Sequence, residues 1–190
     1  MQATSINYLS STKKLFRYYK TLGDAVIERA DEQALHWQYN AESNSIAVII
    51  QHISGNSLSR WSDFLKSDGE KEWRDRDSEF EETTMTKAEL TGLWERGWQC
   101  LFNAIDPLTE DDLAKIVYIR NEGHTVLEAM NRQLAHLPYH VGQMVFIGKM
   151  ITGEGWQSLT IPKGQSQTYN QNKFSADQKD QFFTDGIKKA

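Results

Sequence analysis

The sequence predicts an all-α fold, a four-helix bundle built as one domain over residues 1–190. Four segments repeat apolar residues at the three- and four-residue spacing of one helix face. Two of these segments open with Thr-x-x-Glu, the pattern of a capping box at a helix start. With 190 residues, of which 39% are hydrophobic, the chain is long enough to enclose one sizeable core.

The first predicted helix extends from about Ile6 to Ala30. Its apolar residues recur at helical spacing, and Gly23 is a position that weakens it slightly. Residues 31–45 are polar and lack a period, so we expect a connection in which Asn44 or Ser45 caps the next helix.

The second predicted helix extends from Ser45 to about Lys66, and its apolar residues form one stripe. His52 lies about a third of a turn from that stripe, on the face that it shares with Asn56. A histidine beside the apolar stripe of a bundle helix can point into the cleft between helices, which is where bundles build metal sites.

Residues 67–84 mix acidic and basic side chains densely after an Asp-Gly turn signal. We interpret them as a long charged loop, surrounded by water, between the second and third helices. Arg74 or Arg76 could instead hold a substrate carboxylate, because a guanidinium group binds such a group through two hydrogen bonds. The sequence leaves both interpretations open.

The third predicted helix begins with the capping box Thr86-x-x-Glu89 and stops before Asp106-Pro107. It carries Cys100, the single cysteine of the chain, which we interpret as a small core residue. One cysteine excludes an internal disulfide and a cysteine zinc cluster. A short capped turn in LTEDDL and a brief extended piece in AKIVYIRNEG follow.

The fourth predicted helix begins with a second capping box, Thr125-x-x-Glu128, and carries His136 and His140. Because residues four apart lie on one helix face, both imidazoles point the same way, beside an apolar stripe. This spacing lets one helix give two ligands to one transition metal. His124 lies just outside this helix.

Pro138 interrupts the fourth helix between the two histidines. Proline lacks the N–H of a regular helix and its ring clashes with the Leu134 carbonyl, so the chain kinks there or one helix ends and another begins. We expect the kink, because residues 141–151 keep the helical period.

A histidine pair on an amphipathic helix can also be a pair of ordinary boundary residues, and a third ligand decides between the two interpretations. His52 is our third ligand, because it lies beside its apolar stripe as His136 does. Asn56 and Gln143 share the faces of these histidines, so we expect them to contact the ligands rather than the metal.

Composition excludes several classes of function. The formal net charge is −5 and no dense block of Lys or Arg occurs, which argues against nucleic-acid and membrane-surface partners. No run approaches the roughly 20 apolar residues of a membrane span, so we expect a cytoplasmic protein. After Gly153 the chain is polar and irregular, and we expect the tail beyond about residue 173 to be mobile.

Four helices with one histidine on the second and HxxxHxGQ on the fourth resemble the DinB/YfiT-like superfamily of metalloenzymes. The resemblance covers nearly the whole chain. The segments NSIAVIIQHISGNSLSRWSDFL, DGEKEWRDRDSEF, HLPYHVGQMVFIGKMI and SLTIPKGQS are similar to the branch catalogued as a domain of unknown function. By this resemblance, a three-histidine metal site in a four-helix bundle falls on His52, His136 and His140, and Pro138 puts its exact geometry in question.

Members of that superfamily include S-transferases and isomerases that use a divalent metal and a low-molecular-weight thiol such as bacillithiol or mycothiol. The resemblance therefore implies a metal-dependent enzyme acting on a small molecule, either a thiol-dependent S-transferase or a hydrolase. Zn or Ni is the expected metal, because three imidazoles suit both. The alternative is a non-catalytic, stress-associated module whose metal is structural.

We also expect a homodimer. Five tryptophans make many large apolar rings for one small bundle, and surplus aromatic residues often mark interfaces: Trp61, Trp73, Trp94, Trp98 and Trp156. Dimers are common in the resembled superfamily. The segment SLTIPKGQS would then lie over the metal cleft or across the partner.

Overall fold

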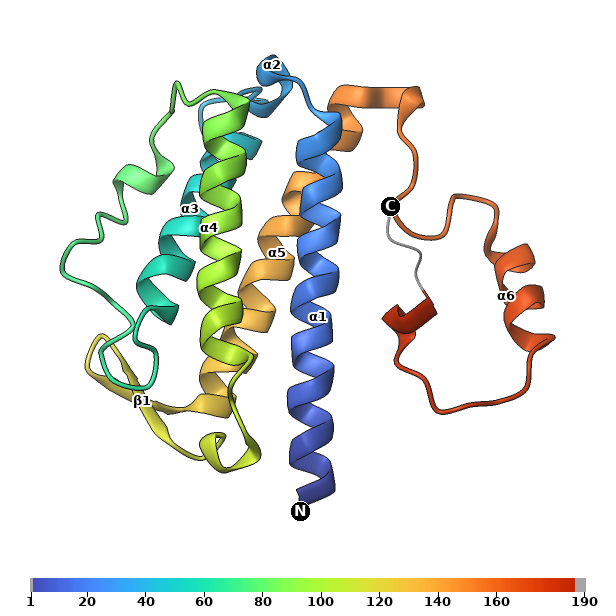
Figure 1. The fold of residues 1–190 in the computed structure, drawn as a ribbon. Coiled ribbons are helices and arrows are strands. Elements are labelled where there is room, and N and C mark those ends of the chain that lie inside the picture. Colours follow the sequence, from blue (N-terminus) through green and yellow to red (C-terminus); the bar gives the residue numbers. More distant parts are fainter. Residues whose placement is uncertain (1, 187–190) are drawn as a thin grey trace.

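The computed structural model describes residues 2–186 and is mostly helical, as predicted. Its α-helices are α1 (Gln2–Arg29), α2 (Glu32–Leu35), α3 (Ile46–Trp61), α4 (Lys87–Ile105), α5 (Val126–Thr152) and α6 (Ser166–Phe174). The long helices α1, α3, α4 and α5 lie side by side (Figure 1). The closest packing is between α3 and α4 and between α1 and α5, and α3 also contacts α5.

Large apolar side chains from all four long helices fill the space between them. The largest fully buried rings are Trp61, Trp94, Trp98 and Phe16. Three of the tryptophans on which we based a dimer thus belong to the core, whereas Trp73 is 62% exposed. Cys100 packs at the edge of this core, in agreement with the prediction.

Gly23 has a packing role, although its low helix propensity weakens α1. A side chain at this position of α1 would collide with the ring of Trp94, whose Nε1 donates a hydrogen bond of 2.7 Å to Asp24. The glycine therefore lets α4 place its largest side chain against α1.

Three of the four predicted helix starts are confirmed, whereas α1 begins at Gln2, before the predicted Ile6. Ser45 caps α3 by accepting a 3.1 Å hydrogen bond from the backbone N–H of Val48. Both capping boxes form, with Thr86 and Glu89 at the start of α4 and Thr125 and Glu128 at the start of α5. Helix α5 runs unbroken past Pro138, which excludes the alternative of two separate helices.

Two predicted boundaries are wrong. Helix α3 ends at Trp61 instead of near Lys66, because Ser62 is extended and Asp63 adopts a left-handed φ of 49°. The connection after α1 contains the short helix α2, which Asp31 starts by accepting a 2.8 Å hydrogen bond from Ala34 N–H. This helix buries Leu35 completely, and a single apolar residue gives no period in the sequence.

The extended piece predicted in AKIVYIRNEG contains one strand of a β-hairpin. Strand β1 (Ile116–Ile119) pairs antiparallel with β2 (Glu122–Thr125), the strand that the sequence did not predict and that holds His124. The two turn residues have φ values of 56° and 61°, as a two-residue hairpin requires. Asp68 accepts hydrogen bonds of 2.9 and 2.8 Å from their N–H groups, which ties the hairpin to the charged loop.

The chain after α5 is less irregular than predicted, because it contains α6, whose side chains are exposed. Arg29 donates a 2.8 Å hydrogen bond to the Gln157 carbonyl and so holds this stretch beside the end of α1. The short 3₁₀ helices of the described chain are η1 (Ser78–Phe80), η2 (Glu110–Asp112), η3 (Gly153–Gly155) and η4 (Phe183–Gly186). Within residues 2–186, no helix has both the length and the apolar content to cross a membrane.

Candidate metal centre

Three histidines from two helices meet in the space between α3 and α5, and they are the three that the sequence predicts. One nitrogen from each of His52, His136 and His140 can be chosen so that all lie within 4.8 Å of one another. Nε2 of His52 is 3.1 Å from Nε2 of His136, and the rings of His136 and His140 are 4.7 Å apart. Pro138 put the geometry of this site in question, but it does not separate His136 from His140 in α5.

The surroundings keep two of these imidazoles, His136 and His140, neutral. Burial lowers the pKa of His136 to about 3, and the positive charges of His140, His52 and two arginines act in the same direction. Burial also lowers the pKa of His140 to about 4, an effect that the Gln143 side chain opposes. A neutral imidazole has a lone pair to give to a metal, so both rings are in the form that binds one.

The donor set fits a divalent transition metal. Nδ1 of His140 is buried and has no hydrogen-bond partner in the described part of the chain. An unsatisfied buried polar atom costs about 1–3 kcal/mol, which a ligand would offset. Two nitrogens bound tetrahedrally to one Zn²⁺ at about 2.1 Å lie about 3.4 Å apart, so ring movements of up to about 1.4 Å would close the triad.

Glu79 orients His52. No sequence pattern predicted this role for Glu79. Its Oε2 accepts a 2.9 Å hydrogen bond from Nδ1 of His52, and Nε2 of the same ring faces the other histidines. A carboxylate behind a metal-binding histidine is the usual way to set the tautomer and orientation of the ring. Glu79 lies in η1, among many exposed acidic residues, so no local pattern distinguishes it.

Arg74 holds Glu79 in place. Its Nε and Nη2 donate hydrogen bonds of 2.7 and 2.9 Å to the two carboxylate oxygens, and its side chain is only 3% exposed. Burial raises the pKa of Glu79, but the hydrogen bonds from His52 and Arg74 outweigh it and keep that pKa below its ordinary value. Gly55 leaves room for this carboxylate, because a Cβ there would collide with Oε1.

The interpretation of residues 67–84 as a solvated loop is therefore wrong for the middle of the segment, where Arg74 and Glu79 lie. The side chains of Arg74 and Glu79 are only 3% and 9% exposed, and their opposite charges neutralise each other. The guanidinium of Arg74 also reaches Glu70 at 3.2 Å, so it is already engaged with two carboxylates. Arg76 is half-exposed and lies over the ring of Phe80 at 5.0 Å. An anion-binding role for either arginine stays a prediction.

The remaining predicted site residues lie close to the cluster. Asn56 is buried one turn after His52 and accepts a 3.2 Å hydrogen bond from Nε2 of Gln133. Gln143 lies near His140, where it raises the pKa of that histidine. Support of the ligands by Asn56 and Gln143 stays a prediction.

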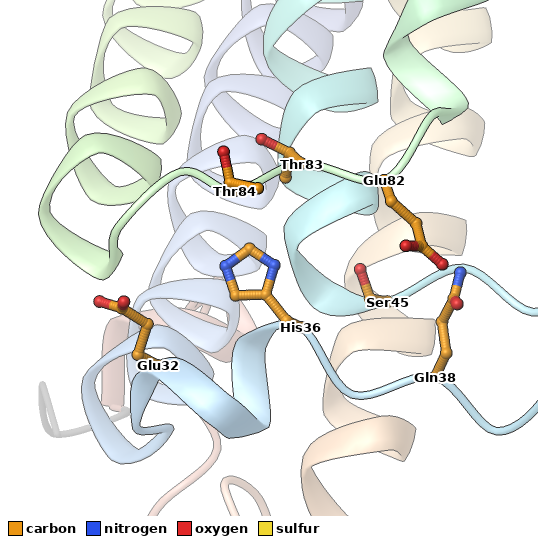
Figure 2. Close-up of a pocket in the computed structure, with 7 residues that line it drawn as sticks. All are labelled: Glu32, His36, Gln38, Ser45, Glu82, Thr83 and Thr84. Carbon is orange, nitrogen blue, oxygen red and sulfur yellow. The ribbon is translucent and has the colours of Figure 1, made fainter.

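A separate pocket of about 340 Å³ opens at the start of α3 (Figure 2). His36 points into it, but its Nε2 is 2.8 Å from the Met85 carbonyl oxygen. Ser45 caps α3, and Glu32 accepts a 3.1 Å hydrogen bond from Lys87 N–H. Three polar groups of this pocket are thus already paired, and within the described residues the grouping that could hold a metal is the histidine triad.

Comparison with known families places the chain in one of them. The family described as "Protein of unknown function (DUF1572)" matches residues 3–165, a range that contains the histidine triad, Glu79 and Arg74. A search of the curated proteins finds no match. Because the match covers most of the 190 residues and ends just before α6, the chain belongs to the DUF1572 family of proteins of unknown function.

Proposed function

We propose that this protein is a metal-dependent enzyme in which His52, His136 and His140 hold one divalent cation, Zn or Ni. The observation that carries the proposal is the convergence of three imidazole nitrogens within 4.8 Å at a point where two helices pack together. Glu79 behind His52 supports it, because a ring that served only to fill space would need no buried carboxylate to orient it.

The arrangement of helices supports a finer fold assignment, a four-helix bundle of the DinB/YfiT-like type. The four long helices α1, α3, α4 and α5 lie side by side, and the triad joins α3 to α5 (Figure 1). This is the arrangement implied by the resemblance between HxxxHxGQ and that superfamily.

The protein's own residues prepare the site for chemistry. Glu79 and Arg74 fix the orientation of His52, and burial keeps His136 and His140 unprotonated at neutral pH. A divalent cation held there would stabilise the ionised form of a bound thiol or water at neutral pH. Catalytic sites keep a position open for such a group, and no fourth His, Cys, Asp or Glu joins the triad among the described residues.

The reaction class that these features favour is transfer to a thiol or hydrolysis of a small molecule. A low-molecular-weight thiol is the expected cosubstrate of an S-transferase, by the resemblance to the superfamily. Incubation of the metal-loaded protein with a panel of cellular thiols and an electrophile tests this directly. A metal ligated by four protein groups would instead favour the non-catalytic module with a structural metal.

Metal analysis of protein purified without an affinity tag tests the site itself. We expect one equivalent of metal in the wild type, its loss in His136→Ala, and its retention in His124→Ala, because His124 lies outside the triad. Equal, sub-stoichiometric metal in the wild type and His136→Ala would remove the proposed site.

A further inference from the structure

A second polar pocket adjoins the histidine triad. It encloses about 590 Å³, within the usual range for small-molecule sites, and His136 forms part of its wall. Four arginines also line it, and we call it the arginine pocket: Arg60, Arg76, Arg120 and Arg132. The amide side chains of Asn56 and Gln133, joined by a hydrogen bond, lie beside them.

Among the described residues, the positively charged side chains that line this pocket are all arginines. The chain has eight arginines, and half of them line the arginine pocket, whereas no lysine or acidic residue is among its described lining. Arginine presents a planar fork of donors that matches carboxylate and phosphate oxygens, which lysine does not. Such a concentration of one charge in a chain of net charge −5 attracts anions to this place.

Arg60 lacks a partner in this pocket. Its residue is only 6% exposed, and Nε has no hydrogen-bond partner within the described residues. Burial, together with the charges of Arg132, Arg74 and Arg120, lowers the pKa of Arg60 to about 10 against the opposing effect of Glu70. A buried guanidinium without its own counterion is costly, so a bound anion would stabilise it.

The helices align this pocket with the triad. Arg60 follows His52 and Asn56 at intervals of four on α3, and Arg132 precedes His136 by four on α5. At 1.5 Å per residue, the arginines lie roughly 6 to 12 Å along the helix axes from the histidines. One small molecule can therefore reach both groups.

We propose that the arginine pocket binds a carboxylate or phosphate group of the substrate and thereby directs the other end of that molecule to the histidine triad. This substrate assignment rests on the proposed function. Arg60 and Arg132 supply the central contacts, one from each helix that carries histidines. Arg76 and Arg120 are half-exposed and pair with Asp77 at 3.8 Å and Glu70 at 3.3 Å, so they form the outer wall.

Calorimetric titration of the metal-free protein with inorganic phosphate and, separately, with succinate tests the pocket at constant ionic strength. We expect saturable binding of at least one probe, and the tighter probe tells a phosphate-bearing substrate from a carboxylate-bearing one. Arg132→Gln should weaken binding about tenfold or more, because a charge-assisted hydrogen bond contributes about 1.5–3 kcal/mol. Arg96→Gln, an exposed arginine on α4 outside the pocket, is the matched control and should leave the affinity unchanged.

Arg60→Met separates anion binding from a structural role. Removing a buried cation that repels its neighbours should leave the melting temperature in chloride buffer unchanged or higher, while phosphate and succinate no longer raise it. A lower melting temperature for Arg60→Met, together with undiminished binding of the anion, would overturn the proposal. So would the absence of saturable binding in the wild type.

His140→Ala distinguishes failure of this inference from failure of the proposed function, since His140 does not line the arginine pocket. We expect this variant to lose metal and to keep its affinity for the anion. Metal binding by the wild type without anion binding would overturn the arginine pocket alone. Anion binding by a wild type that holds no metal would support the anion site and overturn the enzyme assignment.

Discussion

The residue that most shapes the candidate site is Glu79, although it is not a ligand in the triad. It joins His52 to Arg74, so one buried carboxylate links the first histidine of the triad to the charged loop. The two hydrogen bonds from Arg74 leave the carboxylate little freedom to turn. The orientation of His52 thus depends on residues 22 and 27 positions away in the sequence.

Glu79→Gln should weaken metal binding about 10- to 100-fold, the usual cost of losing an outer carboxylate. The amide keeps the size of the side chain but removes the charge that favours the Nδ1–H tautomer of His52. Titration of the metal-free protein with Zn²⁺ measures the change. Glu72→Gln, an exposed carboxylate of the same loop, is the control; equal affinities for both variants would show that Glu79 does not support the site.

The two histidines of α5 in the triad should make the metal-free protein sensitive to mild acid. Their pKa values, about 3 for His136 and about 4 for His140, lie below the ordinary 6.5 that applies to the unfolded chain. Between these values the unfolded chain binds more protons, so the free energy of unfolding should fall as pH drops below about 6.5 and continue to fall towards pH 3–4. Glu79, whose pKa is also lowered, adds its loss only below about 4.5.

Urea denaturation of the metal-free protein at about pH 7.5 and pH 5.5 measures this dependence in the window where the histidines dominate. His140→Asn should show a smaller decrease than the wild type, because it removes one of the two groups. A decrease of the same size in both proteins would assign the acid sensitivity to other residues.

At the scale of elements, the contact between α3 and α4 depends on a glycine. A Cβ at Gly97 of α4 would lie 2.8 Å from the Cα of Ser54 in α3, so the two helix backbones approach closely there. Ser54 lies two residues after His52, and this contact therefore sets the position of the helix that carries the first histidine. Backbone atoms, unlike the end of a flexible side chain, cannot move aside without shifting a whole helix.

Gly97→Ala should destabilise the protein by about 1–3 kcal/mol through overpacking, even though alanine favours helix more than glycine does. Gly142→Ala on α5 is the matched control, because its Cβ would meet no atom within 4 Å. That variant should be more stable by up to about 1 kcal/mol. Thermal unfolding of both variants checks the pair, and stabilisation by Gly97→Ala would contradict the close approach.

At the scale of the whole molecule, three large apolar side chains of α5 are exposed on the side of the helix opposite the core. Tyr139, Phe146 and Met150 are 66%, 63% and 43% exposed and lie within about 40° of one another around the helix. Gly142 lies beside them with open space in front of it. We propose this stripe as the interface of the homodimer, in place of the tryptophans that are buried in the core.

Light scattering at micromolar concentration should give twice the 21.9 kDa mass of the chain. Phe146→Glu should yield the monomer, because a charge in an apolar interface loses its hydration. Phe174→Glu, on the exposed helix α6 where Phe174 is 84% exposed, should remain dimeric. A wild-type mass near that of one chain would contradict the predicted dimer.

The C-terminal segment lies outside the wall of the arginine pocket. The residues that line the arginine pocket all precede residue 140, so SLTIPKGQS does not form part of its wall. Coverage of the site by the partner's segment stays a prediction. Deletion after Gly153 would leave metal content unchanged if the segment does not cover the site in either way.

The sequence by itself determined the four long helices, the starts of three of them and the three histidines. Helical period, capping boxes and the i, i+4 pair depend on residues three or four positions apart, so the interactions that produce them are visible as local patterns. His52 could be added because it occupies the same place beside its apolar stripe as His136. The early end of α3 and helix α2 were missed because each depends on a single backbone conformation or a single buried leucine.

Only the tertiary structure decided which charges of the loop between α3 and α4 are buried and what they serve. His52 meets Glu79 across 27 positions and His136 across 84, and Gln133 meets Asn56 across 77. Such contacts form only after the helices have packed, and many acidic and basic residues of the loop would satisfy the same local pattern. The arginine pocket likewise collects residues from two helices, a loop and a hairpin turn, because packing, and not spacing along the chain, brings their charges together.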